Sequence, residues 1–249
     1  MPDFKPFVLK FDSLPSTNTE AAQQARKGAP EGLCVVADEQ TAGRGRLQRE
    51  WVSPRGAGLY FSIVLRPVLE QRYWPLITFA AALAVHDALV EVCALETDIK
   101  WPNDLIVDDR KISGILAETL DTAIGKAVIV GIGINLTNAA FPEELGRSAT
   151  SVAGATGEEP HPNIVLESLL RAFEKRYLTL QSDGGSTEII REWSRHSPYA
   201  SGKRIRVSDN GERIEGAARG VDSAGALRVE TDAGEIRLVH AGDVTVLKQ

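Results

Sequence analysis

Hydrophobic and polar residues alternate with different periods along the chain, and these periods predict its helices and strands. Short apolar runs between turn residues predict strands at residues 7–11, 33–40, 59–65, 98–101, 105–107, 111–120 and 127–136. Apolar residues at helical spacing predict helices at residues 17–28, 74–92, 163–180 and 186–196. Residues 41–58 and 138–162 show neither pattern and are predicted to be loops.

Two of the predicted helices carry further signals. In the helix predicted at residues 17–28, Thr17 and Glu20 have the spacing of a capping box, and Gly28 is a natural stop. The helix at residues 74–92 is apolar from Trp74 to Val85. This run is too short to span a bilayer, so we expect a buried core helix.

The pattern changes after Pro198. From Lys203 onwards, short alternating segments are separated by turn sequences at regular intervals, which is typical of a small antiparallel barrel. We therefore predict two domains, residues 1–199 and 200–249. The first mixes strands and helices without βαβ alternation, which predicts an α+β fold with helices packed on a mixed, largely antiparallel sheet.

Composition narrows the function classes. The chain has 249 residues, of which 43% are hydrophobic and 25% charged, as in ordinary globular proteins. Its net charge of −6 argues against a dedicated nucleic-acid-binding protein. Cys34 and Cys93 are isolated and the four histidines are scattered, so we expect no disulfide framework and no zinc site. The N-terminus lacks a secretory signal, which favours the cytoplasm.

The first segment with candidate chemistry runs from Gln40 to Trp51. It contains Arg44, Arg46 and Arg49 on a backbone with two glycines, in a chain that is acidic overall. Arginine forks match phosphate geometry, and glycines let backbone N–H groups approach a ligand, so the segment suggests binding of a phosphorylated group. A solvated surface loop is the alternative. The spacing fits neither a Walker A loop nor a dinucleotide-binding turn.

A second segment combines a turn with a strand. Pro102 forces a turn that leaves Asn103 and Asp104 at the corner of two strands. Lys111 opens the following apolar strand, where a fixed positive charge can stabilise a developing negative charge. Gly114 removes a side chain from that strand. A plain hairpin with a solvated lysine is the alternative.

Two further segments offer polar groups or open backbone. Gly131 and Gly133 lie on one face of a strand, which would leave that face flat for a ligand, with Asn135 nearby. A glycine pair that serves only packing is the alternative. The run Ser16–Thr17–Asn18 stands at a helix start, where it could bind a polar ligand or simply cap the helix.

Taken together, these segments resemble the biotin protein ligase family. The order is STN at residue 16, QTAGRGR at residue 40, KWPND at residue 100, KISGIL at residue 111 and GIGIN at residue 131. The match covers roughly residues 8–137, and the ordered set is far more specific than any one motif. The resemblance implies the biotin–lipoate ligase fold, which is like that of class II synthetases, followed by an SH3-like β-barrel.

The resemblance also implies roles for individual residues. Those implied at biotin are Ser16, Thr17, Asn18, Gln40, Gly43, Arg44, Gly45, Arg46, Lys111, Gly114, Gly131 and Gly133. Those implied at ATP are Arg46, Arg49, Trp51, Asn103, Lys111 and Asn135. The implied catalytic residues are Lys111, Arg44, Arg46 and Asp104, and Asp104 is also a candidate Mg²⁺ ligand. Phe141 and Trp193 are candidates for stacking on adenine.

The implied reaction has two steps. The biotin carboxylate attacks the α-phosphate of ATP to give biotinyl-5′-AMP, and a lysine of a biotin carboxyl carrier protein then takes the biotin. The carrier would belong to acetyl-CoA carboxylase or a similar carboxylase, and the ligase would be a monomer or a homodimer without membrane association. A lipoate or other acyl-protein ligase and a non-catalytic biotin or nucleotide sensor are the alternatives.

The chain departs from the family pattern in two places. Leu47 and Gln48 stand where many relatives have Arg-Gly, so we expect Leu47 to help order the loop and the retention of the intermediate to change. Only a short segment precedes the first predicted strand, whereas some family members carry an N-terminal helix-turn-helix repressor domain. We therefore expect no specific DNA binding.

Overall fold

The computed structural model describes residues 4, 6–138, 146, 148–198, 200–209 and 212–247. In chain order the elements are β1 (Phe7–Phe11), α1 (Thr17–Arg26), β2 (Leu33–Ala37), β3 (Gly58–Leu65), α2 (Leu76–Cys93), β4 (Asp98–Lys100), β5 (Asp104–Val107), β6 (Arg110–Thr122), β7 (Gly125–Asn135), α3 (Val152–Thr156), α4 (Pro162–Gln181), α5 (Gly185–Arg195), β8 (Ser201–Asp209), β9 (Glu212–Val221), β10 (Leu227–Glu230), β11 (Ile236–Val239) and β12 (Asp243–Val246). Short 3-10 turns lie at Arg46–Gln48 and Gln71–Tyr73.

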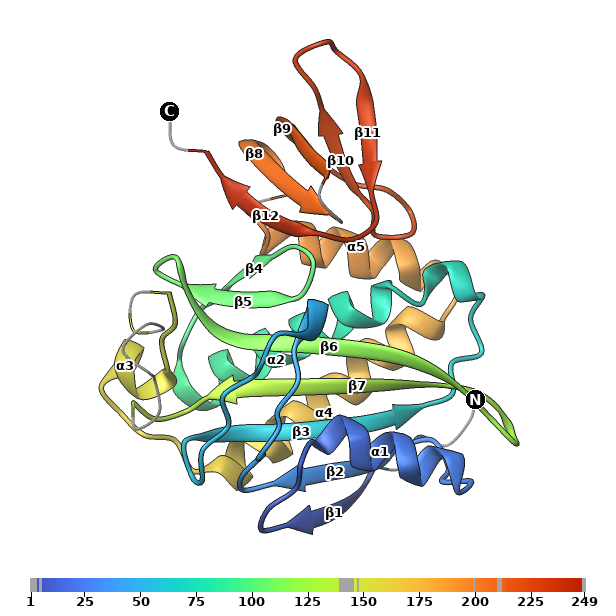
Figure 1. Ribbon diagram of the computed structural model, residues 1–249, viewed down its shortest axis with the longest axis vertical. Coiled ribbons are helices and arrows are strands. Elements are labelled where there is room, and N and C mark those ends of the chain that lie inside the picture. Colours follow the sequence, from blue (N-terminus) through green and yellow to red (C-terminus); the bar gives the residue numbers. More distant parts are fainter. Residues whose placement is uncertain are drawn as a thin grey trace.

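A seven-stranded sheet with the order β1-β2-β3-β7-β6-β5-β4 forms the first domain (Figure 1). All its pairs are antiparallel except β1 with β2, so the expected α+β fold with a mixed, largely antiparallel sheet is confirmed. The domain does contain one βαβ unit, formed by β1, α1 and β2, which the sequence pattern did not indicate. Ala21 and Ala25 on α1 are fully buried in a cluster with Leu33 and Val35 of β2, which holds the crossover helix on the sheet.

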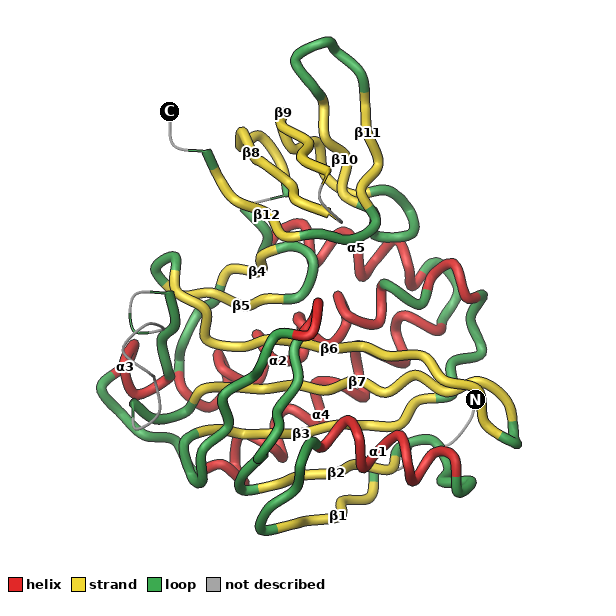
Figure 2. Tube along the Cα trace, in the orientation of Figure 1, coloured by secondary structure: helices red, strands yellow, loops and turns green. Residues whose placement is uncertain are grey.

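The other face of the sheet is covered by helices α2 and α4, and α5 packs against both of these helices (Figures 1 and 2). By length and composition alone α2 could cross a membrane, but 67% of it is buried in the domain core, as the sequence predicts. The ring of Phe79 on α2 stacks on Trp193 of α5, with 4.2 Å between ring centroids. Trp193 is fully buried there, so it is not the adenine-stacking residue considered from the sequence.

The second domain is a small antiparallel sheet with the order β11-β10-β9-β8-β12, which fits the expected barrel-like fold. It packs against the end of the first domain where β4 and α5 lie (Figure 1). The indole N–H of Trp101 donates a hydrogen bond of 3.0 Å to the carbonyl of Gly225 in the second domain. This contact ties the second domain to the turn that follows β4.

Most local predictions hold within a residue or two. The hairpin between β5 and β6 turns through Asp108 and Asp109, which both have positive φ (50° and 61°), as the composition of the turn predicts. The segment expected to be a loop between residues 138 and 162 contains the short helix α3, which Ser151 caps by accepting a hydrogen bond from the N–H of Gly154. Phe141 lies outside the described residues.

Candidate active site

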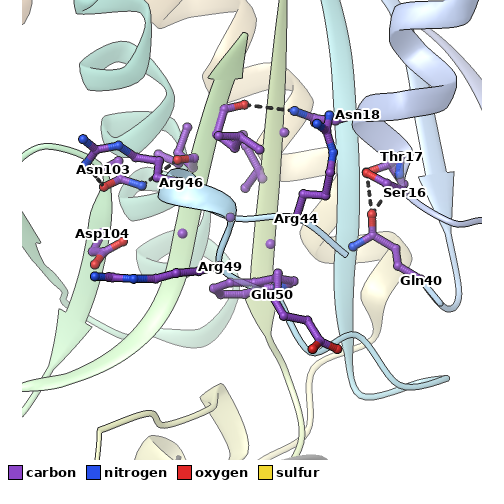
Figure 3. Close-up of a pocket in the computed structure, with 18 of the residues that line it drawn as sticks. Ser16, Thr17, Asn18, Gln40, Arg44, Arg46, Arg49, Glu50, Asn103 and Asp104 are labelled. Atoms are coloured by element: carbon purple, nitrogen blue, oxygen red, sulfur yellow. Dashed lines mark hydrogen bonds between the residues drawn. The ribbon is translucent and has the colours of Figure 1, made fainter. Parts of the chain in front are cut away.

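A pocket on the face of the sheet that α2 does not cover gathers most of the residues singled out in the sequence (Figure 3). Those lining it are Ser16, Thr17, Asn18, Gln40, Arg44, Gly45, Arg46, Arg49, Trp51, Asn103, Asp104, Lys111, Gly114, Gly131 and Gly133. The expected residues Gly43 and Asn135 are not in the lining. Glu50, Phe61, Ile115, Leu116, Ile132 and Asp243 line the pocket and were not expected.

One end of the pocket is a group of buried polar side chains at the start of α1. Ser16 is the N-cap residue but makes no capping hydrogen bond with its side chain, so the expected capping box at Thr17 was wrong. Thr17 instead lies within the first turn, and its N–H and hydroxyl both donate to Oε1 of Gln40, at 2.8 and 3.1 Å. The side chains at this helix start are therefore directed to the pocket and not to the helix.

A serine that sequence reasoning missed holds this group together. Ser62 on β3 is fully buried, and its Oγ lies 2.7 Å from Oγ1 of Thr17 and 2.6 Å from Oδ1 of Asn18. One hydroxyl proton can serve only one of these acceptors at a time. The signal in the sequence was a single polar residue within the otherwise apolar strand GLYFSIVL, in which all eight residues are buried.

A carboxylate that the sequence analysis did not select links the helix to the arginine loop, which we define as residues 43–51. Oε2 of Glu118 on β6 accepts hydrogen bonds from Nδ2 of Asn18 at 2.8 Å and from Nη2 of Arg44 at 2.6 Å. Glu118 therefore joins the loop, α1 and β6 at one point. Because its side chain is about one-third exposed (36%), the ion pair with Arg44 is partly screened by solvent.

The glycines on β6 and β7 admit neighbouring side chains rather than leaving a bare surface. A Cβ atom at Gly131 would lie 2.0 Å from Oδ1 of Asn18, and one at Gly133 would lie 2.4 Å from Cε2 of Trp51. Gly114 pairs with Gly133 across the two strands, and the indole of Trp51 also approaches Gly114. The flat glycine surface expected from the sequence is thus covered by Asn18 and Trp51.

Trp51 leaves one polar atom without a partner. Its indole nitrogen Nε1 is buried and has no hydrogen-bond acceptor among the described residues. Leaving a buried donor unpaired is costly. Its ring also stacks beneath the ammonium of Lys111, which lies 5.2 Å from the ring centroid. Trp51 therefore lines the pocket with a buried donor that no described residue satisfies.

At the other end of the pocket, cations face acceptors from the protein. Nζ of Lys111 lies 2.6 Å from Oδ1 of Asp104. Nη1 of Arg46 donates to Oδ1 of Asn103 at 3.1 Å and to the carbonyl of Gly242 at 3.4 Å. Arg49 forms an ion pair with Asp243, so two arginines of the loop reach the second domain. These three cations make this end of the pocket suited to an anionic ligand.

The arginine loop has an unusual backbone. Leu47 and Gln48 both adopt positive φ, at 54° and 59°, a conformation that disfavours residues with a side chain. Leu47 is 56% exposed, so its side chain adds little packing to the loop. Gly43 closes the base of the loop, where a Cβ atom would lie 2.2 Å from the carbonyl oxygen of Trp51.

Tyr60 and Asn135 support the pocket from outside its lining. Burial raises the pKa of Tyr60, so its hydroxyl stays protonated and donates to the carbonyl of Pro54 at 3.0 Å. Nδ2 of Asn135 donates to the carbonyl of Thr150 at 3.0 Å, and the N–H of Thr150 donates to the carbonyl of Lys111 at 2.8 Å. Asn135 is therefore linked through Thr150 to the strand that carries Lys111.

Comparisons with known proteins agree on one family. Residues 10–135 match the model of the biotin/lipoate A/B protein ligase family, and residues 200–247 match that of the biotin protein ligase C terminal domain. A bifunctional ligase/repressor BirA from Bacillus subtilis is 39% identical over 95% of this chain and 73% of its own length. A biotin–[acetyl-CoA-carboxylase] ligase from Mycobacterium tuberculosis is 34% identical over 94% of this chain and 86% of its own.

The fold has a close counterpart among solved structures. The biotin protein ligase from Aquifex aeolicus, in complex with biotin and ATP, superimposes with a TM-score of 0.84 and 28% identity. The alignment covers 99% of this chain and all of that one. The likeness therefore extends over both domains.

Proposed function

Because this chain belongs to the biotin protein ligase family, we propose that its pocket makes biotinyl-5′-AMP and then passes biotin to a lysine of a biotin carboxyl carrier protein. Biotin and ATP are the substrates of the ligase. One observation carries the proposal: a set of buried polar side chains lies at one end of the pocket and a cluster of cations at the other. In that cluster, Nζ of Lys111 lies 2.6 Å from Oδ1 of Asp104. These are the two kinds of surface that a polar ring and a phosphate need.

The buried polar end suits the ureido ring of biotin. Ser16, Thr17 and Asn18 are each less than 5% exposed, and Gln40 bonds directly to Thr17. A buried polar ring binds only where its N–H and C=O groups find partners, and these side chains carry both donors and acceptors. Gly131 makes room for Asn18, and Gly133 makes room for Trp51.

The cationic end suits the carboxylate and phosphates. The ammonium of Lys111 is placed to hold the biotin carboxylate against the α-phosphate and to stabilise charge as pyrophosphate leaves. Arg44 and Arg46 would bind phosphate oxygens, while Arg49, Trp51 and Asn103 would contact the nucleotide. Asn135 lies outside the lining and we assign it a positioning role, through Thr150, for the strand of Lys111.

Asp104 has two proposed roles. In the second step the carrier amine must be neutral to attack, and its ordinary pKa is about 10.4, so a nearby carboxylate that accepts its proton would help. Asp104 also fits Mg²⁺, because it offers one carboxylate beside the phosphate end, and magnesium sites use one or two carboxylates together with substrate phosphates. Bound there, Mg²⁺ would neutralise phosphate charge.

The setting of the reaction follows from the same proposal. The carrier belongs to acetyl-CoA carboxylase or a similar carboxylase, as the names of related ligases suggest. Cys34 and Cys93 are free thiols, which suits a reducing cytoplasm.

We divide the chain into a catalytic domain, residues 1–199, and a barrel-like domain, residues 200–249, because the second sheet begins at Ser201.

Transfer to a carrier tests the proposal. We would incubate the ligase with ATP, a carrier domain and either biotin or lipoic acid, and detect the modified carrier by mass. The proposal predicts ATP-dependent attachment of biotin and none to a carrier whose target lysine is arginine. Attachment of lipoyl groups instead would favour the lipoate-ligase alternative, and tight biotin binding without any attachment would favour a sensor.

Removing the charge of Glu118 tests the link between α1 and the arginine loop. In the Glu118→Gln variant we expect the KM for biotin to rise by about 3- to 10-fold, because a partly exposed ion pair contributes at most about 1 kcal/mol and one hydrogen bond to Asn18 is also weakened. Steady-state kinetics measure this rise. The control is Glu39→Gln, which removes the partner of Arg55, a carboxylate about as exposed as Glu118 (35%); equal changes in both variants would refute the role of Glu118.

The positive φ of Gln48 gives a prediction for the intermediate. Gln48→Gly relieves about 1 kcal/mol of backbone strain at φ 59°, so we expect the loop conformation of this structure to be favoured and biotinyl-5′-AMP to escape about fivefold more slowly. Release of labelled adenylate after rapid filtration measures the rate. The control is Leu47→Ala, which keeps a Cβ atom at φ 54° and therefore keeps the backbone strain. Equal slowing in both variants would contradict this account.

A further inference from the structure

A second cluster of chemically active side chains lies away from the pocket. It brings together His86 from α2, Glu96 from the segment between α2 and β4, and His196 directly after α5. One ligand atom from each residue lies within 4.8 Å of the other two. The histidines are 110 positions apart in the chain, so the sequence could not pair them. None of the three lines the pocket.

His86 has the features of a metal ligand. It is buried, and its Nδ1 lies 3.0 Å from Oγ1 of Thr97, which can accept the ring proton and so fix the tautomer. The lone pair of Nε2 then faces Oε2 of Glu96 at 3.4 Å.

The other ligands complete one side of a coordination sphere. The ring of His196 lies against that of His86, with 4.1 Å between centroids. The carboxylate of Glu96 is 78% exposed, so an ion and its bound water can enter from solvent on that side.

Hydrogen bonds hold β4 and the residues after α5 together beside the cluster. The N–H of Ile99 on β4 donates to the carbonyl of His196 at 2.6 Å, and the hydroxyl of Ser197 donates to the carbonyl of Ile99 at 2.6 Å. These bonds fix the end of α5 against the edge strand. The first strand of the second domain, β8, begins only a few residues later at Ser201.

We propose that His86, Glu96 and His196 bind one divalent transition-metal ion of the Zn²⁺ class, with water in the remaining position. Two imidazoles and one carboxylate are a donor set that such ions take readily, whereas Mg²⁺ and Ca²⁺ prefer oxygen ligands alone. The ion joins α2, the segment before β4 and the end of α5 just before the second domain. This site is separate from biotin ligation and its role is structural.

Cobalt is a convenient probe of this site because Co²⁺ reports its coordination by visible absorption. We would titrate the metal-stripped full chain with Co²⁺ and with Zn²⁺, and follow absorption and the melting temperature. We expect one ion per chain and a rise in melting temperature of about 5–10 °C when the free metal is 100-fold above its Kd. Glu96→Gln and His196→Gln should each lose most of the rise.

Two controls keep the test decisive. His240→Gln removes an exposed histidine from the second domain and should bind Co²⁺ as the unaltered chain does. Unfolding of each metal-free variant shows whether it is folded before the titration. The proposal is overturned if the unaltered chain binds no ion with a stabilising effect, or if Glu96→Gln and His196→Gln bind it as tightly as the unaltered chain.

Discussion

Substituting glutamine for Lys111 lowers biotin-dependent exchange of labelled pyrophosphate into ATP by about 10²- to 10³-fold, the usual loss when one preorganised charge at a reacting oxygen is removed. Lys111 lines the pocket at its cationic end, and its ammonium lies over the ring of Trp51. Glutamine keeps most of the length of the side chain and removes its charge.

The control for Lys111 is a lysine of the same sheet. Lys126 on β7 forms an exposed ion pair with Asp121 at 2.7 Å, far along the strand from the pocket, so Lys126→Gln should leave exchange unchanged. The measured quantity is the initial rate of exchange at saturating biotin and ATP. An exchange rate in Lys111→Gln within threefold of the unaltered enzyme would remove Lys111 from the centre of the reaction.

The second large effect is expected from adding one methyl group at Gly131. A Cβ atom there would lie 2.0 Å from Oδ1 of Asn18, so Gly131→Ala must displace Asn18 from Ser62 and Glu118. Leaving these buried polar groups unpaired costs roughly 1–3 kcal/mol, which corresponds to about a 10- to 100-fold weaker binding of biotin. Titration calorimetry with biotin measures the change.

A double variant tests the physical cause. If Gly131→Ala acts by displacing Asn18, then Gly131→Ala combined with Asn18→Ala binds biotin no more weakly than the weaker of the two single variants. Additive losses would mean that the methyl group acts on biotin directly or on the sheet. Circular dichroism and the melting temperature show whether β7 remains intact in each variant.

The sequence predicts the fold where periodicity is strong. The apolar strand at residues 59–65 and the apolar helix at residues 74–92 are found within two residues of their expected ends. The βαβ unit was missed because a parallel pairing depends on how α1 crosses between β1 and β2, which local patterns do not record. The two-domain division rests on the change of pattern after Pro198.

The candidate site was predicted for residues that carry motifs and missed for residues that act through their neighbours. Fifteen of the expected residues line one pocket, because the motifs name charged and glycine-rich segments that stand out. Ser62 and Glu118 did not stand out, since their roles arise only when distant strands pair and bring them to Asn18. Trp51 was expected, but its position over Gly133 depends on the path of the whole arginine loop.

The most direct test of the central claim is pyrophosphate exchange by the unaltered enzyme itself. Labelled pyrophosphate would be incubated with ATP and the enzyme, with biotin, with lipoic acid or with neither acid. The account predicts label in ATP only when biotin is present, because only biotin fits the buried polar end of the pocket and forms the adenylate. No exchange with biotin, or equal exchange with lipoic acid, would contradict it.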